Sequence, residues 1–163
     1  LTVQSLEPGS THAYYMYPIR FDAEAIGISR NLFLRAVSAE LPKPRFWDTT
    51  PLAEGYIKPL YLAPVYQKQI ALGRKGFPFT CNPGVTYNYE KGICPVVEAL
   101  YERELLLTPL VREGMELADL RDFADAIEKV VSGAYELRGR FGSESDDSLY
   151  DPIRAIDDHV KTS

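Results

Sequence analysis

The sequence predicts an α+β domain, a small and largely antiparallel sheet with helices packed on one face. Two observations point to this fold class. Residues 12–21 are rich in aromatic and branched side chains, which is typical of a strand. Residues 116–137 carry apolar side chains at intervals of three and four, which is typical of an amphipathic helix. The order along the chain is strand, helix, long loop, helix, strand and helix, and this order favours helices on one face of a small sheet.

The first elements are the strand at residues 12–21 and the helix that follows it. Pro18 has no amide hydrogen for a strand ladder, so it favours an edge position or a strand end. Residues 22–27 are typical of a turn, and Ser29 is suited to cap a helix that runs to about residue 40. The apolar face of this helix is expected to consist of Leu32, Phe33, Ala36 and Val37.

The middle of the chain is irregular, because prolines and glycines recur from residue 42 to residue 92. A loop-rich stretch of this length inside a domain is usually functional. A short helix is expected within it, around residues 65–72. Pro95 is suited to the first turn of a helix that ends at about Arg103, and residues 105–107 are typical of a short buried strand.

The C-terminal part combines the clearest helix with an acidic tail. The helix at 116–137 is expected to bury one continuous apolar stripe. Residues 143–148 are typical of a mobile acidic linker, and residues 149–160 favour a weak amphipathic helix. The predicted domain covers residues 12–138, preceded by a linker over residues 1–11 and followed by a flexible tail over residues 139–163.

Composition limits the class of protein. The chain has 163 residues, of which 45% are hydrophobic and 25% charged, and this suits a single globular domain. A net charge of −5 without a basic cluster argues against binding to a nucleic-acid backbone. No apolar stretch approaches the roughly twenty residues of a membrane span, and no signal peptide is visible. A chain that opens on Leu1 is expected to be processed or part of a longer protein, and we predict a cytoplasmic location.

The chain carries no self-contained catalytic motif. It has no nucleophile elbow, no phosphate-binding loop and no metalloprotease helix motif. Its two cysteines and two histidines are not spaced as zinc ligands, so we predict no metal site. Glycines and cations at residues 73–76 follow no strand, which favours a solvated loop. The sequence therefore predicts no catalytic residue in this chain.

Four segments resemble the small C-terminal domain of the DegT/StrS-type sugar aminotransferases. Residues 12–20 are similar to the strand that opens this domain in the family. Residues 56–66, with Pro-Leu-Tyr and a closing Pro-Val-Tyr, resemble the family's Pro-Leu-His segment. Residues 94–109 resemble its Pro-Val-Ala-Glu helix and leucine-rich strand, and residues 117–131 resemble its closing helix. The ordered combination is more specific than any single motif.

The resemblance implies a fold-type I enzyme that depends on pyridoxal phosphate (PLP). Such an enzyme transfers an amino group from glutamate or glutamine to a keto-sugar, often nucleotide-linked, for surface polysaccharides or secondary metabolites. In the family, the cofactor lysine, the aspartate beneath the pyridine nitrogen and the phosphate cup belong to a large N-terminal domain. That domain is not in this sequence, so the chain alone is expected to hold no PLP and to be inactive. The resemblance also implies a homodimer for the complete enzyme.

The resemblance places possible sugar contacts at His12, Tyr14, Tyr56, Lys58 and Tyr61. Aromatic faces and hydroxyls suit a sugar ring, and the ammonium of Lys58 suits a phosphate or carboxylate. Tyr61 stands where the family commonly has His, which leaves a hydrogen-bonding group but removes one that titrates near neutral pH. The alternative is that these tyrosines are packing residues with polar tips.

A second functional hypothesis remains open from the sequence. The chain could be a non-catalytic sugar-binding or dimerisation module that uses the same domain. The reading frame upstream of Leu1 discriminates between the two hypotheses, because only the enzyme requires a large domain with a PLP lysine.

Overall fold

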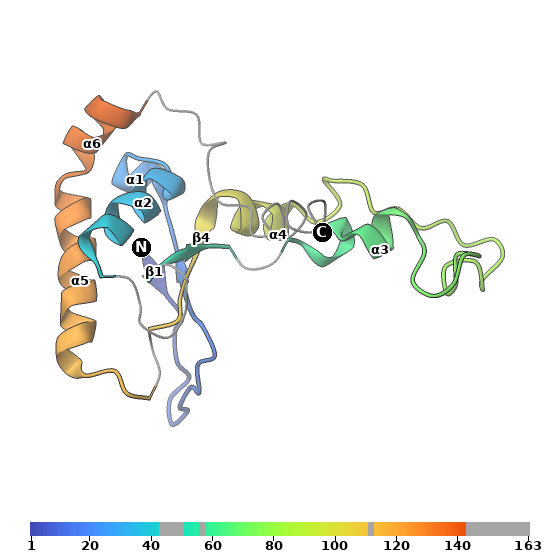
Figure 1. Ribbon diagram of the computed structural model, residues 1–163, viewed down its shortest axis with the longest axis horizontal. Helices are drawn as coiled ribbons and strands as arrows, with labels where there is room; N and C mark the ends of the chain where they lie inside the picture. Colours follow the sequence, from blue (N-terminus) through green and yellow to red (C-terminus); the bar gives the residue numbers. More distant parts are fainter. Residues whose placement is uncertain (43–50, 56–57, 111–112, 143–163) are drawn as a thin grey trace, which may run out of the picture.

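In the described part of the chain, four short strands form one open antiparallel sheet (Figure 1). The computed structural model describes residues 1–42, 51–55, 58–110 and 113–142. The strand order is β1-β2-β4-β3, so the two longest strands lie in the middle. The strands are β1 (Thr2–Val3), β2 (Tyr17–Arg20), β3 (Ala53–Glu54) and β4 (Leu105–Thr108). The predicted α+β class with a small antiparallel sheet is confirmed.

Strand β2 is shorter than the sequence predicts. It begins at Tyr17, opposite Thr108 of β4, whereas residues 12–16 form a loop. Pairing stops there because Pro109 follows Thr108 and has no amide hydrogen to continue the ladder. The expected strand over 12–21 is therefore wrong in its first half, and its aromatic residues lie in a connection.

The segment predicted as a linker, residues 1–11, contributes β1, one of the two edge strands of the sheet. Thr2 of β1 pairs with Arg20, and Val3 pairs with Ile19. A two-residue strand is too short to show a period of two in the sequence. The sheet therefore extends closer to the N-terminus than the predicted boundary at residue 12.

Four helices lie on one side of the sheet and form with it the compact part of the molecule, here called the body (Figure 1). The N-terminal pair follows β2 directly, and the C-terminal pair forms the outer edge, with α2 between the sheet and α5. Their bounds are α1 (Ala23–Ile26), α2 (Arg30–Glu40), α5 (Leu117–Ser132) and α6 (Ala134–Phe141). The expected turn at 22–27 is the short helix α1, capped by the carboxylate of Asp22.

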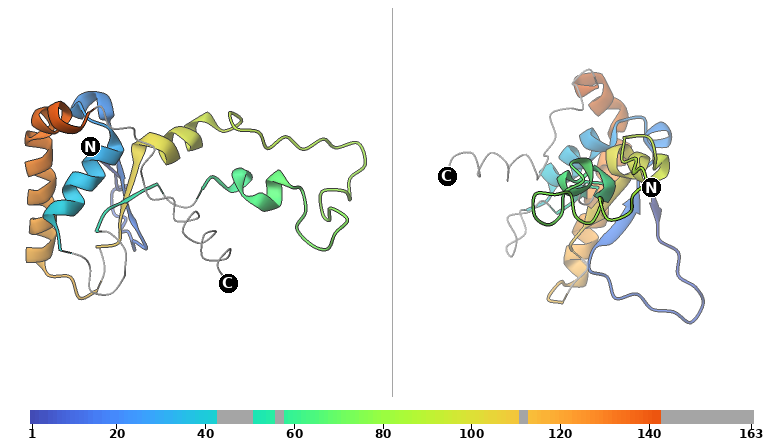
Figure 2. Two further views of the ribbon diagram at one scale, coloured as in Figure 1. Left: turned by 45° about the horizontal axis from the view of Figure 1, so that its top comes forward. Right: turned by 90° about the vertical axis from the view of Figure 1, so that its right-hand side faces the viewer.

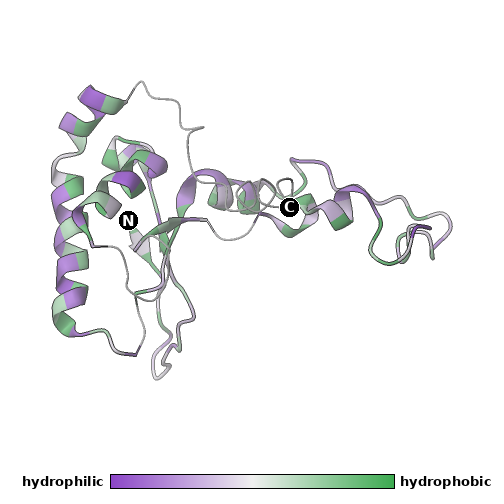
Figure 3. Cartoon of the chain, viewed as in Figure 1, coloured by the Kyte–Doolittle hydropathy of each residue, from purple (hydrophilic) through white to green (hydrophobic). Residues whose placement is uncertain are grey.

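The core of the body forms where α2 meets the sheet. The hydroxyl of Ser29 accepts a hydrogen bond from the amide of Leu32 at 3.2 Å, which starts α2 where the sequence predicts. Phe33 and Val37 are fully buried, and the ring of Phe33 lies 5.0 Å from that of Phe21. Hydrophobic colouring follows the strands and recurs along α5 (Figure 3).

The long C-terminal helix differs from its prediction in two ways. The chain breaks at Gly133 into α5 and α6, because glycine is a poor helix former. The expected apolar stripe is also only partly buried. Ala126 and Val130 belong to the core, whereas Leu117, Leu120 and Val131 are exposed.

A long extension leaves the body after β3 and returns to it before β4; its described residues, 58–99, are here called the arm (Figures 1 and 2). It contains the helical turn η1 (Leu60–Leu62) and the short helices α3 (Pro64–Gln67) and α4 (Pro95–Ala99). A π-helical turn, η2 (Leu100–Glu104), leads from α4 into β4. Much of the irregular stretch predicted from the sequence is this arm.

The arm joins the body through a buried arginine. Arg30 begins α2 and is only 4% exposed. Its guanidinium donates hydrogen bonds to the carbonyl oxygens of Tyr101 at 2.7 Å, Glu102 at 2.8 Å and Leu105 at 3.3 Å. One side chain therefore holds the end of the π-helical turn against the first turn of α2.

Helix α6 carries the described chain past the predicted domain end at residue 138 to Phe141. The predicted acidic linker and terminal helix, residues 143–160, lie outside the described residues. Across the described helices, none combines the length and the apolar composition needed to cross a membrane.

Candidate functional site

The aromatic residues of the first predicted site segment form a row that runs through the loop before β2 to Tyr17, the first residue of that strand. His12 stacks on Tyr14 with ring centroids 4.8 Å apart, and Tyr14 meets Tyr17 edge-on at 4.7 Å. His12 is exposed and Tyr14 is half-buried. The row therefore offers an exposed imidazole and two partly exposed tyrosine rings, which are groups suited to a sugar contact.

The second predicted segment lies at the root of the arm. Tyr61 belongs to η1, and its hydroxyl donates a hydrogen bond to the carboxylate of Glu98 in α4. The same Glu98 oxygen accepts from the amides of Gly92 at 2.7 Å and Cys94 at 3.4 Å. These four groups are here called the clasp. They connect the outgoing and returning limbs of the arm.

Local sequence explains how Glu98 reaches this position. Pro95 occupies the first position of α4, where its missing amide hydrogen costs no helical hydrogen bond. Glu98 is then in the first turn of the helix and turns back toward the amide of Cys94, which precedes the helix. Two amides that the helix cannot use are satisfied by one buried carboxylate.

The clasp fixes the protonation of both its side chains. Burial and the hydrogen bond to Glu98 raise the pKa of the Tyr61 hydroxyl to about 12. The hydrogen bond from Tyr61, aided by the Gly92 and Cys94 amides, lowers the pKa of Glu98 below the ordinary glutamate value of 4.5. Near neutral pH, Tyr61 is a donor and Glu98 is an anion. The pair is therefore suited to hold structure and not to exchange protons with a substrate.

Beyond the clasp, the arm is held by aromatic rings. Phe79 contacts the rings of Tyr66, Tyr87 and Tyr89 at centroid distances of 6.1, 5.7 and 6.1 Å. The side-chain amide Nε2 of Gln67 donates to the backbone carbonyl oxygens of Tyr61 at 2.9 Å and Tyr89 at 2.6 Å. The four aromatic residues are here called the ring cluster, and they join the two limbs farther from the body.

The other predicted contacts are less constrained. Lys58 is exposed at the start of the arm, and among the described residues no carboxylate lies within ion-pair distance of it. Tyr56 lies outside the described residues. The exposed ammonium of Lys58 is suited to an anionic group of a ligand.

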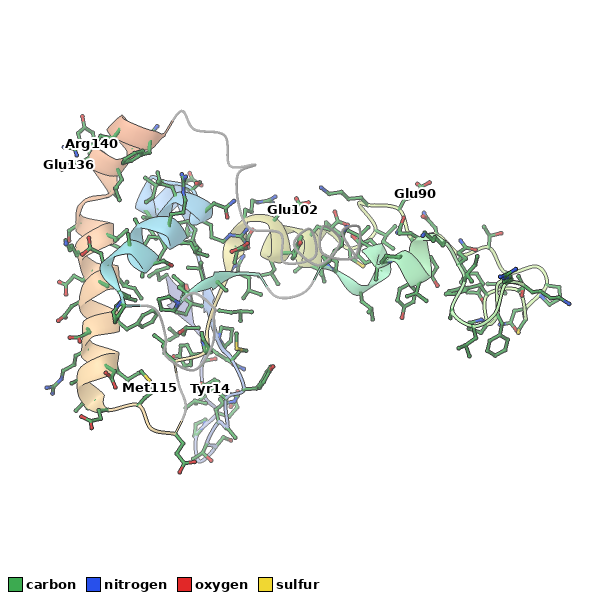
Figure 4. All side chains as sticks on the ribbon, in the orientation of Figure 1. Tyr14, Glu90, Glu102, Met115, Glu136 and Arg140 are labelled. Atoms are coloured by element: carbon green, nitrogen blue, oxygen red, sulfur yellow. The ribbon has the colours of Figure 1, made fainter. Side chains whose placement is uncertain are left out.

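The structure does not join the two predicted segments into one pocket. Figure 4 places Tyr14 on the loop at the foot of the sheet and Glu90 far out on the arm, which leaves the body in another direction. No hydrogen bond, ion pair or ring contact among the described residues connects His12 or Tyr14 with Lys58 or Tyr61. The substrate role of these residues stays a prediction, and it requires a further surface that spans both segments.

Sequence reasoning missed a groove between the helices of the body. A space of about 580 Å³ lies between α2 and the α5–α6 pair. Leu32, Ala36, Val130 and Leu137 give it apolar walls. Charged side chains also line it, among them Glu136 and Arg140, which Figure 4 shows on α6. The apolar positions of both helices were visible in the sequence. The groove was not, because it depends on how α2 packs against α5 and α6.

The described residues do not fit a PLP site. The amine of Lys91 pairs with Glu102, and that of Lys129 lies 2.6 Å from Glu40. The remaining described lysines are exposed: Lys58, Lys68 and Lys75. A PLP lysine needs an enclosed pocket with donors for the phosphate, and none of these lysines has one. Within the described residues, no three acidic, cysteine or histidine side chains gather as a metal site.

Comparisons with known proteins give one distant relative. No family model matches the chain, and no solved structure matches it at a significant level. The chain is similar to an uncharacterized protein of Methanocaldococcus jannaschii, with 28% identity over 121 residues. The match covers 74% of this chain and 24% of the relative, so the chain spans about a quarter of the length of the curated relative it matches. The relative's name carries no activity.

Proposed function

We propose that this chain is the C-terminal small domain of a PLP-dependent aminotransferase that acts on a keto-sugar. The amino group comes from glutamate or glutamine, and the sugar is nucleotide-linked. PLP supplies the electron sink for the transfer and is held by a large domain that precedes this one. This chain covers the site and orients the sugar.

The segments that resemble the aminotransferase family occupy coherent places in the fold. The first contains β2, and the third runs through α4 and η2 into β4, which pairs with β2. The fourth is α5, which packs against α2 on the same side of the sheet. A chance resemblance would not be expected to select both central strands and the long helix.

The hydrogen bond between Tyr61 and Glu98 is the observation that carries the proposal. It joins two of the resembling segments, the Pro-Leu-Tyr segment and the Pro-Val-Val-Glu helix, across 37 positions of sequence. It also accounts for the departure from the family's pattern. A histidine at position 61 could donate an N–H to the same carboxylate, so tyrosine replaces one donor by another.

The arm is suited to position the sugar substrate. It projects from the body as one extension (Figure 2). A small domain with such an extension can close over a neighbouring site, exclude water and contact the sugar. Tyr61 then acts as a positioning residue, since its hydroxyl holds the arm through Glu98 instead of facing open solvent.

The test uses the full-length protein that contains this chain. We expect it to bind PLP and to convert a nucleotide-linked keto-sugar with glutamate or glutamine into an amino-sugar, detected by mass spectrometry. The 163-residue chain alone is expected to bind no PLP. A full-length protein that binds nucleotide-sugars without PLP would instead support a non-catalytic module.

Two variants test the role of Tyr61. In the full-length enzyme, Tyr61→Phe is expected to slow the keto-sugar half-reaction by about ten- to a hundredfold, because it removes the donor that positions the arm. The half-reaction with the amino donor should change much less. Tyr61→His restores a donor and is expected to recover most of the rate. Equal losses in both half-reactions, or no recovery with His, would assign Tyr61 to packing.

A further inference from the structure

Helix α5 has an apolar stripe that the body does not cover. Leu117 is 64% exposed and Val131 is 40% exposed. Leu120 and Ala124 are also exposed, and Ile127 is half-buried. Helix α5 forms the outer edge of the body, on the opposite side of the molecule from the arm (Figure 1). The stripe is therefore accessible and far from the clasp.

The spacing of this stripe is that of a helix-pairing surface. Its members follow one another at alternating steps of three and four, which is the a/d pattern of a coiled coil. They are here called the seam: Leu117, Leu120, Ala124, Ile127 and Val131. Phe123 and Val130, which belong to the core or pack against it, flank the seam at the next position around the helix, and Ile127 at the border of the seam also contacts the core. Helix α5 thus has two adjacent apolar faces; the core buries one of them, and on the other Leu117, Leu120 and Val131 stay exposed.

Charges beside the seam indicate what covers it. Arg121 and Glu128 lie on its free flank, one heptad apart, and both are exposed. Among the described residues, neither takes part in an intrachain ion pair. In an antiparallel pair of identical helices, equivalent flanks face each other. Arg121 would then face Glu128 of the second copy, and the contact would occur twice.

We propose that the seam of α5 pairs with the same seam of a second copy of this chain, in antiparallel orientation. With the twofold axis between Ala124 and Ile127, Leu120 packs against Val131 of the second copy. The small side chain of Ala124 lies next to the axis and lets the helices approach closely. This inference does not depend on the proposed enzymatic function.

The size of the seam sets the strength of the association. Stable protein interfaces bury about 1,600 Å² in total, and two heptads of one helix pair supply less than that. The charge pairs are exposed, so they select the register more than they add affinity. Association of the 163-residue chain is therefore expected to be weak and to depend on ionic strength.

The experiment is sedimentation equilibrium of the 163-residue chain over a concentration range from about 1 μM to about 1 mM. The wild-type chain is expected to form dimers at the upper end of this range. Arg121→Glu and Glu128→Arg each place like charges opposite each other twice, and each is expected to weaken dimerisation about ten- to thirtyfold. An equimolar mixture of the two variants is expected to form a heterodimer, since every charge pair is then opposite again.

Controls separate this surface from the rest of the molecule. Asp122→Lys reverses a charge on the opposite side of α5 and is expected to leave the dissociation constant unchanged. Circular dichroism of each variant confirms that the helix is formed. A chain that stays monomeric throughout the range, or single variants that dimerise like the wild type, would overturn the proposal. A mixture that associates no better than the separate variants would also overturn it.

Discussion

The body and the arm are stabilised by different kinds of interaction. The body has a continuous apolar core, in which Phe33, Val37, Leu52 and Leu106 are fully buried. The apolar core cluster includes no described residue of the arm. Several large apolar side chains of the arm are instead exposed, for example Leu60 at 70%. The body is therefore held by apolar burial, which is the dominant stabilising term in folding.

The arm relies on a polar clasp at its root and on a ring cluster farther out. Hydrogen bonds and ring contacts of this kind each contribute about 1 kcal/mol. A segment with few buried apolar contacts opens at a lower free energy than a core does. The arm can therefore change conformation while the body stays folded. Four predictions test this difference between the arm and the body.

The largest effect is expected from a core substitution in the body. Phe33→Ala removes a fully buried ring that contacts Phe21 and should destabilise the chain by about 3–5 kcal/mol. Urea unfolding followed by circular dichroism measures this loss. Leu60→Ala on the arm is the matched control and should change the free energy of unfolding by less than about 0.5 kcal/mol. Similar losses for both variants would contradict the division into body and arm.

The joint between the two regions should be the next most sensitive place. Arg30→Met keeps an apolar stem but leaves the carbonyl groups of Tyr101, Glu102 and Leu105 without this donor. We expect a loss of about 2–4 kcal/mol in the free energy of unfolding, measured by urea titration. The exposed Arg20, which pairs with Glu104 at 3.0 Å, provides the control. Arg20→Met should cost less than about 1 kcal/mol, and an equal cost would refute the assigned role of Arg30.

The clasp should give a local effect that depends on pH. Because the folded arm lowers the pKa of Glu98, the contribution of Glu98 is fully present above the ordinary value of 4.5. It is lost as the pH falls through the lowered pKa. The amide signals of Gly92 and Cys94, which donate to this carboxylate, report its protonation by NMR. We expect their shifts to titrate with a midpoint below pH 4.5.

Glu98→Gln provides the comparison for the clasp. The variant should show no such titration and should leave the unfolding of the body nearly unchanged. Glu102→Gln removes a neighbouring carboxylate outside the clasp and should retain the titration of both amides. A midpoint at or above 4.5 in the wild-type chain would show that the clasp does not stabilise the anion.

The smallest effect is expected from an exposed ion pair within the body. Lys129 of α5 lies 2.6 Å from Glu40 of α2, but the lysine side chain is 68% exposed. Lys129→Met should lower the free energy of unfolding by less than about 1 kcal/mol, and the loss should shrink at high salt. Urea unfolding at a low and at a high salt concentration measures this loss in the free energy of unfolding. A loss above about 2 kcal/mol that salt does not change would mean that charge, and not burial alone, joins these helices.

Local signals in the sequence predicted much of the body. Ser29 as a helix cap, Pro95 as a helix start and residues 105–107 as a buried strand are each confirmed by the structure. Each depends on a few neighbouring residues. The two-residue strands β1 and β3 were not predicted, because such short strands have no readable period.

The sequence pattern did not predict contacts between residues that are far apart in the sequence. The hydrogen bond between Tyr61 and Glu98 joins residues in separate elements, and neither residue shows a spacing that indicates the other. The division of the α5 stripe into a buried and an exposed half likewise depends on where α2 lies. The sequence predicted the two aromatic segments of the candidate site. Only the structure shows that these segments lie apart from each other.

The route by which the arm leaves and re-enters the body has an evolutionary consequence. Strands β3 and β4 are hydrogen-bonded neighbours, and the amide of Gly55 donates to the carbonyl of Leu105 at 2.8 Å. The whole arm is thus an enlarged hairpin turn, inserted between two adjacent positions of one sheet. The entropy of closing such an insertion grows only slowly with its length. Mutation can therefore lengthen, shorten or replace the arm while the sheet keeps its register, and relatives can acquire new specificities on an inherited scaffold.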